Sequence, residues 1–360
     1  MKYTPLSLIA EITHRCPLHC VYCSNPIEMQ ARQNELPTAV WKKVFDDAAD
    51  LGVLQLHLTG GEPTARDDIV ELISHGRSKN LYINLITSGV GLTEEKLKKY
   101  CEVGLDHIQL SFQDSQAGPA NEFAGAKAHL VKIAAARMIK KFPLALTMNV
   151  VIHRQNLERL AEMIALGESL QADRLEIAHV QYYGWAFKNR ESLLPTREQV
   201  KESIEIINAA KVRLKDQLRI DFVVPDYYAK YPKPCMGGWG QKSILIDPAG
   251  RVMPCHAAMV IPDLKFENVK DQSLRAIWEK SQAFEKFRGD DWMQEPCRSC
   301  DRKSQDYAGC RCQAFLIAGD AAATDPVCSL APQRKQVDDE VAKANVGQSQ
   351  PWIYRKLSAD

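Results

Sequence analysis

Cysteine is the residue type whose number and spacing could do chemistry in this chain. Three of the 11 cysteines, Cys16, Cys20 and Cys23, lie in the sequence CPLHCVYC. A four-iron cluster and a structural zinc both prefer four ligands, so three thiolates in a short loop suggest a metal centre with one open position. The simpler alternative is a zinc ion with His19 as its fourth ligand. A disulfide framework is disfavoured, because the chain is long, its cysteine count is odd and no export signal is expected.

A second motif, LTGGEP, follows the second apolar segment and ends at Pro63. Its paired glycines permit a backbone approach that a Cβ atom would block, and Glu62 with nearby peptide groups could bind a ligand ammonium. Alone, the motif would be ordinary turn chemistry. Together, CxxxCxxC and GGEP resemble the signature of the radical S-adenosylmethionine (SAM) superfamily.

This resemblance implies a cofactor site at the first three cysteines. In that superfamily the three thiolates hold a 4Fe-4S cluster whose fourth iron binds SAM, and cleavage of SAM gives a 5'-deoxyadenosyl radical that abstracts a substrate hydrogen. Four further side chains at strand ends or within strands would bind the carboxylate and ribose, although each could equally make a local hydrogen bond. The implied SAM-binding residues are Gly60, Gly61, Glu62, Pro63, Ser88, Ser111, Gln113 and Asn149.

Seven more cysteines lie between Cys235 and Cys328. Their spacing resembles the SPASM extension, which carries two auxiliary iron-sulfur clusters and a central CxxCx5CxxxC pattern; Asp306 stands where that pattern has a cysteine. Zinc knuckles and a solvated Asp306 are the alternatives. The resemblance implies one cluster on Cys235, Cys255, Cys310 and Cys312, and another on Cys297, Cys300, Asp306 and Cys328.

These motifs must be positioned by the elements between them. Six segments of alternating apolar residues begin at Leu6, Leu54, Leu81, His107, Leu144 and Leu175 and alternate with helical patterns, which is typical of parallel βαβ units. About 210 residues for six units, against about 250 for a closed eightfold barrel, predict an α/β fold, a partial (β/α)6 TIM-like barrel with the chemistry at the strand carboxyl ends. We expect the barrel over residues 1–225, the Cys-rich SPASM extension over 226–330 and a C-terminal tail over 331–360.

Composition narrows the possible partners. With 46 Lys plus Arg against 45 Asp plus Glu, the net charge is +1, which supplies no general field for nucleic acid. No apolar run is long enough for a bilayer-spanning helix. We therefore expect a cytoplasmic protein that binds neither nucleic acid nor membrane. Separately, we expect the C-terminal tail to dock through Trp352 and Tyr354.

Several stretches, among them CPLHCVYCSNP, NLITSGVGL and KPCMGGWG, resemble one SPASM family, the PqqA peptide cyclases of pyrroloquinoline quinone (PQQ) biosynthesis. This implies a carbon-carbon bond between a glutamate γ-carbon and a tyrosine ring in the precursor peptide PqqA, with an auxiliary cluster taking the remaining electron. It also implies the peptide chaperone PqqD and an electron donor such as flavodoxin.

The segment after the sixth strand is the candidate substrate contact. Gln181, Tyr182, Tyr183 and Trp185 lie where a peptide could enter, although packing at a domain junction would equally account for the aromatic side chains. Two functions remain as alternatives: another SPASM peptide maturase, forming a thioether or oxidising Cys or Ser, and a zinc-stabilised scaffold without catalysis.

Overall fold

The computed structural model describes residues 3–346 and 350–355, and the chain divides into two compact units, each described here by itself. The first unit comprises Met1–Arg15, Glu28–Ile83 and Asp226–Glu340, and the second comprises Cys16–Ile27, Asn84–Pro225 and Val341–Asp360. The strands are β1 (Ser7–Thr13), β2 (Gln55–Gly60), β3 (Tyr82–Thr87), β4 (His107–Phe112), β5 (Ala145–Ile152), β6 (Arg174–His179), β7 (Arg219–Val223), β8 (Ser243–Ile246) and β9 (Val252–Met253). The α-helices are α1 (Thr38–Asp50), α2 (Ile69–Ser78), α3 (Glu94–Glu102), α4 (Ala117–Ala124), α5 (His129–Ile139), α6 (Leu160–Ser169), α7 (Gly184–Lys188), α8 (Arg190–Leu193), α9 (Arg197–Arg213), α10 (Leu274–Lys280), α11 (Gln282–Glu285), α12 (Lys303–Asp306), α13 (Arg311–Ala318) and α14 (Arg334–Val346).

In the first unit, β1 lies between two parallel neighbours. Leu8 is opposite Leu56 of β2 on one side and Ile244 of β8 on the other, and β9 pairs with β8 in the antiparallel direction. Helix α1 buries one apolar stripe, and Thr38 is its first residue. The Thr38 hydroxyl donates to Asp68 Oδ2 at 2.6 Å.

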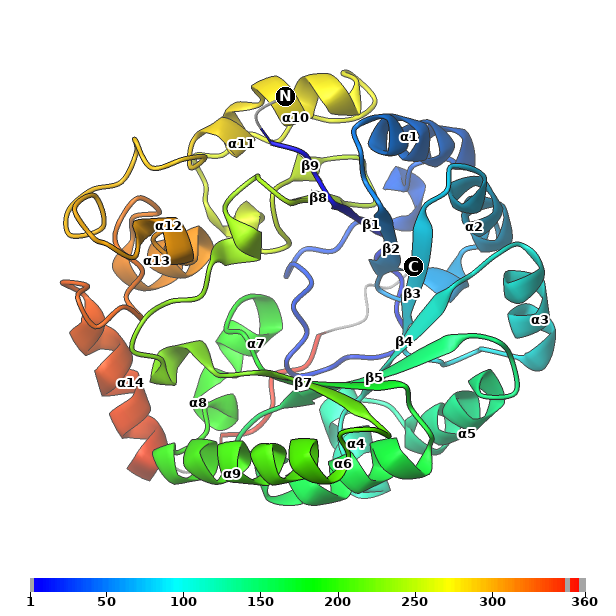
Figure 1. The fold of residues 1–360 in the computed structure, drawn as a ribbon, viewed down its shortest axis with the longest axis horizontal. Coiled ribbons are helices and arrows are strands. Elements are labelled where there is room, and N and C mark those ends of the chain that lie inside the picture. The colour runs from blue at the N-terminus through cyan, green and yellow to red at the C-terminus, as the bar shows by residue number, and fades with distance from the viewer. Residues whose placement is uncertain (1–2, 347–349, 356–360) are drawn as a thin grey trace. The chain divides into compact units, whose positions relative to one another are not determined.

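In the second unit, the last four residues of β3 pair with β4, and β4, β5, β6 and β7 continue in parallel. Helices α5, α6 and α9 lie along one face of these strands (Figure 1). Two helices begin at threonine N-caps: Thr93 accepts from Lys96 N at the start of α3, and Thr196 forms a capping box with Gln199 at the start of α9. The strand and helix alternation predicted from the sequence is therefore confirmed.

Strands β7 and β8 were not expected. Strand β7 adds a parallel strand after α9, and β8 joins β1 although it lies in the Cys-rich part of the chain. Residues 226–340 therefore group with β1, β2 and their helices, whereas the domain limits at 225 and 330 remain a prediction. Within the part of the chain that the structure describes, no helix is both long enough and apolar enough to cross a membrane.

Candidate active site and metal centres

The loop of residues 16–23 carries the first three cysteines and is held against the end of α4. His19 N donates to Ala124 O at 2.8 Å, and Val21 N donates to Phe123 O at 3.0 Å. The buried Leu18 packs on Ala124, and the Cys16 and Cys20 side chains lie against this apolar cluster. Burial, together with the neighbouring Cys23 and Cys16 thiols, raises the pKa of the Cys20 thiol to about 12. Three thiols that interact electrostatically suit a cationic metal centre, which would take them as thiolates.

Lys132 is a buried cation near this loop that the sequence analysis missed. Its side chain is 1% exposed, and Nζ donates to Ser111 O at 2.9 Å and to Gln113 Oε1 at 2.7 Å. The Lys132 charge also opposes the rise in the pKa of Cys20. The spacing of Lys132 and Ala136 along α5 places the lysine on the buried stripe of the helix, which is the signal that could have revealed it.

The four polar candidates for SAM binding in the second unit differ in their present roles. Ser111 and Asn149 are opposite each other on β4 and β5, and both are half-buried. Ser88 Oγ accepts from Val90 N at 3.3 Å, a local turn interaction, while Gln113 is held by Lys132. Ser111 and Asn149 therefore form the more accessible polar pair.

The GGEP segment belongs to the first unit and is fixed against the end of β1. Gly61 N donates to Thr13 O, and Glu62 N donates to Arg15 O, each at 2.7 Å. A Cβ atom on Gly60 would lie 2.1 Å from Thr13 O, and one on Gly61 would lie 2.3 Å from Arg15 O. Both positions therefore require glycine, because any larger residue would collide with backbone. The buried Glu62 carboxylate accepts from the Thr64 amide and hydroxyl, at 3.1 and 2.8 Å.

The structure brings Cys235, Cys255, Cys310 and Cys312 together in the first unit. Cys255 Sγ lies 3.7 Å from Cys312 Sγ. Hydrogen bonds from Cys235 and Cys312 lower the pKa of Cys255 to about 5, whereas interactions among the thiols raise the pKa values of the other three. Four thiols in mutual contact, two of them on buried and two on half-buried cysteines, with one favoured as thiolate, are a donor set suited to an iron-sulfur cluster.

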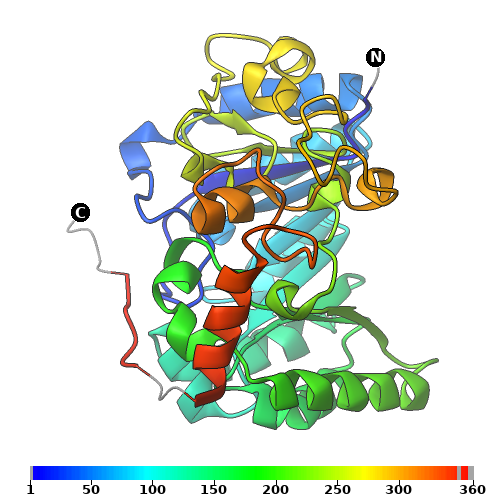
Figure 2. The same ribbon diagram turned by 90° about the vertical axis from the view of Figure 1, so that its left-hand side faces the viewer.

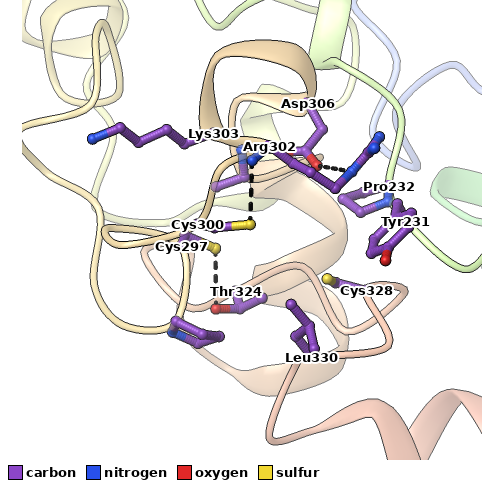
Figure 3. Close-up of a pocket in the computed structure, with 12 residues that line it drawn as sticks. Tyr231, Pro232, Cys297, Cys300, Arg302, Lys303, Asp306, Thr324, Cys328 and Leu330 are labelled. Carbon is purple, nitrogen blue, oxygen red and sulfur yellow. Dashed lines mark hydrogen bonds and ion pairs between the residues drawn. The ribbon is translucent and has the colours of Figure 1, made fainter.

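The other predicted ligand group lines one pocket, which Figure 3 shows with Cys297, Cys300, Cys328 and Asp306. Cys297 Sγ lies 3.2 Å from the Thr324 hydroxyl. Asp306 is 7% exposed, which argues against a solvated loop carboxylate. Its side chain accepts from Ala308 N at 3.1 Å and lies 3.5 Å from Arg302 Nε. Within the described ranges, no group of three or more His, Cys, Asp or Glu side chains is arranged to hold a single metal ion.

Asp325 connects the two groups of auxiliary cysteines and was not found from the sequence. Its Oδ2 accepts from Cys310 N at 2.8 Å, and its carbonyl oxygen accepts from Cys328 N at 2.8 Å. Gln313 Nε2 donates to Asp325 Oδ1 at 2.9 Å. A single buried residue thus fixes the backbone of one predicted ligand from each group.

A second buried network missed by the sequence analysis surrounds Glu11 of β1. His14 Nε2 lies 3.2 Å from Glu11 Oε2, and His256 Nδ1 contacts the other carboxylate oxygen. Because His14 Nδ1 accepts from Gln30 N, its Nε2 is the donor to Glu11. Burial alone would raise the pKa of Glu11, but the two histidines outweigh it and lower the pKa to about 2.

The candidate substrate segment adjoins the cysteine loop. Trp185 N donates to Cys23 O at 3.1 Å, and a Cβ atom on Gly184 would approach the same carbonyl. Tyr182 and Trp185 are buried, which favours packing for these two side chains. Tyr183 is half-buried, and its hydroxyl donates to Gln181 Oε1 at 3.1 Å, so Gln181 and Tyr183 are the more accessible pair.

Comparison with known proteins agrees with this arrangement. Residues 10–167 match the Radical SAM superfamily, and residues 235–301 match SPASM, an iron-sulfur cluster-binding domain. The chain is 54% identical over 355 residues to the PqqA peptide cyclase of Gluconobacter oxydans (strain 621H), with 98% of each chain covered.

Two solved structures of Streptococcus suis SuiB share the fold. The form bound to S-adenosylmethionine matches with a TM-score of 0.76 at 18% identity, covering 91% of this chain and 78% of SuiB. The form bound to the precursor peptide SuiA has a TM-score of 0.74 at 18% identity, with 91% and 76% covered. The expected α/β fold, a partial barrel followed by a SPASM extension, is therefore confirmed.

Proposed function

The chain belongs to the family of PqqA peptide cyclases, radical SAM enzymes with a SPASM domain, and from this membership we propose that it crosslinks PqqA in PQQ biosynthesis. The bond joins the γ-carbon of a glutamate to the ring of a tyrosine. The observation that carries this proposal is the 54% identity over nearly the whole of both chains. The protein is a radical SAM oxidoreductase whose cofactors are iron-sulfur clusters and S-adenosylmethionine.

In this proposal Cys16, Cys20 and Cys23 hold the SAM-binding 4Fe-4S cluster. When bound, cluster and SAM together supply a 5'-deoxyadenosyl radical that abstracts a substrate hydrogen. The apolar contacts of Leu18 with α4 exclude water from one side of the loop. The Lys132 ammonium orients Gln113 and provides a positive charge for the carboxylate of SAM.

The GGEP segment, Ser88, Ser111, Gln113 and Asn149 bind SAM in this proposal. Two groups hold the auxiliary clusters. Mutual contact among four thiols supports the first, and the burial of Asp306 in a pocket with three cysteines supports the second. The ligands proposed are Cys235, Cys255, Cys310 and Cys312, and Cys297, Cys300, Asp306 and Cys328.

We further propose PqqD as the peptide chaperone and a flavodoxin-like electron donor. We also propose a cytoplasmic location, because the cluster ligands must stay reduced thiols. All 11 cysteines lie in the described ranges, and none of them forms a disulfide. If PqqD changed neither the peptide affinity nor the turnover, its assignment as partner would be wrong.

The test is to incubate the anaerobic, reduced protein with SAM, PqqA and PqqD and to sequence the product by tandem mass spectrometry. A crosslink lowers the peptide mass by two hydrogens, and fragmentation places it between Glu and Tyr. A thioether or an oxidised Cys or Ser would indicate another SPASM maturase instead. The purified enzyme should be brown and contain about ten or more irons. A colourless protein that contains zinc would instead indicate the zinc-stabilised scaffold without catalysis.

Tyr183 provides a test of substrate contact, because its hydroxyl is more accessible than the buried aromatic side chains beside it. A Tyr183→Ala variant is expected to lose crosslinking while it still cleaves SAM. Full crosslinking activity in variants of Gln181, Tyr182, Tyr183 and Trp185 would refute the assignment of this segment to the substrate.

A further inference from the structure

Residues 350–355 cross the loop that carries the first three cysteines. Arg355 Nη2 donates to Leu18 O at 2.6 Å and to Cys16 O at 3.2 Å. In return, His19 Nδ1 donates to Arg355 O at 3.1 Å. These contacts all lie within the second unit, and the segment itself is extended (Figure 2). The C-terminal segment thus binds the backbone of the cysteine loop directly.

Asn189, between α7 and α8, joins the same two segments from another direction. Its Nδ2 donates to Val21 O at 2.8 Å and to Ile353 O at 2.9 Å. Its Oδ1 accepts from Ile353 N at 2.8 Å. Asn189 is buried, and its bond to Val21 O is shielded from competing water. Together the three hydrogen bonds link the loop and the C-terminal segment.

The segment is anchored on α4 by its two aromatic residues. Trp352 Nε1 donates to Glu122 Oε1 at 2.7 Å, and the Tyr354 hydroxyl donates to Glu122 O at 3.0 Å. The Trp352 ring stands nearly perpendicular to Phe123, with 5.8 Å between ring centroids. Since α4 also accepts hydrogen bonds from the cysteine loop, the loop is bound by α4 and by residues 350–355.

We propose that residues 350–355 form a strap that positions the cysteine loop for its cluster, with Arg355 as the main positioning residue. The inference rests on the proposed function only in taking Cys16, Cys20 and Cys23 as cluster ligands. The strap acts in two ways. Its hydrogen bonds restrict the loop backbone, and the guanidinium, bonded to the carbonyl of Cys16 itself, places a positive charge beside an anionic ligand set. Such a charge makes the cluster easier to reduce.

The test compares Arg355→Gln with Arg355→Lys in the anaerobic holoenzyme. Arg355→Gln is expected to speed amide exchange in residues 16–23 about tenfold, to release the SAM-binding cluster faster to a chelator and to lower its midpoint potential. Arg355→Lys, which keeps the charge, should restore most of the potential but not the slow exchange. Arg213→Gln is the matched control, because Arg213 pairs on the surface with Glu168, and it should change none of the three.

A second variant removes the anchor and leaves Arg355 in place. In Trp352→Phe/Tyr354→Phe both hydrogen bonds to Glu122 are lost while each position keeps an aromatic ring, so loop exchange should rise without a change of charge. Unchanged exchange, release and potential in Arg355→Gln would overturn the proposal, as would equal loss of the auxiliary clusters. If the unaltered chain bound no iron at the three cysteines, the proposed function would fail. Amide exchange in Arg355→Gln would still test whether the strap restricts the loop.

Discussion

Replacing Gly61 with alanine is expected to push the GGEP segment away from β1. The added Cβ would lie 2.3 Å from Arg15 O and 2.6 Å from His14 O, whereas an ordinary carbon-oxygen contact is about 3.3 Å. One of the two backbones must therefore move by about 1 Å. A displacement of that size in a positioning segment costs about a hundredfold in rate, and the strain costs about 1–3 kcal/mol of folding free energy.

The assay measures 5'-deoxyadenosine formation under dithionite and SAM affinity by equilibrium dialysis, with thermal unfolding alongside. Gly118→Ala in α4 is the matched control, because its Cβ would meet nothing within 4 Å; this variant should be neutral or more stable by up to about 1 kcal/mol. Wild-type SAM affinity and rate in a stable Gly61→Ala protein would refute the argument that this close approach sets the position of GGEP.

Substitutions at three buried carboxylates provide further tests. Glu11→Gln should lower the free energy of unfolding at pH 7 by about 3 kcal/mol, because the pKa of Glu11 falls from 4.5 to about 2 on folding. This contribution to stability is present above pH 4.5 and is lost as the pH falls toward 2. An unchanged urea midpoint at pH 7 would contradict it. Asp306→Asn should lose iron and the EPR signal of the second auxiliary cluster, while Asp306→Cys should keep the iron; an unaltered spectrum in Asp306→Asn would remove the residue as a ligand. Asp325→Asn should release the first auxiliary cluster to a chelator faster, since it weakens the side-chain bond to Cys310 N, and equal rates in variant and wild type would count against that role.

The strands β1 to β6 could be predicted because their apolar residues alternate and helical patterns separate them. Strand β8 could not: its four residues SILI are all buried and show no alternation. Its partner β1 lies far away in the sequence, with Ser7 and Ser243 separated by 236 positions. Pairing over such a distance leaves no local signal in either segment.

The cysteines could be singled out because residue type and spacing reveal metal chemistry without any knowledge of packing. The residues that support them were harder to find. Asn189 and Asp325 act through contacts with distant backbone, and each alone looks like an ordinary loop residue. Lys132 also bonds distant backbone, and only its place on the buried stripe of α5 could have revealed it. The docking of Trp352 and Tyr354 was expected, but its target, Glu122 of α4, was not.

The contact between Arg355 and the cysteine loop has a consequence for biogenesis. His19 and Arg355 are separated by 336 positions, and at roughly 5–20 residues per second the ribosome needs between roughly 15 and 70 seconds to span them. During that interval the loop that carries the three cysteines lacks its hydrogen bonds to Arg355. Iron and sulfide that arrive after Arg355 has been synthesised would bind a loop already held by these bonds, whereas earlier arrival would meet a loop without them.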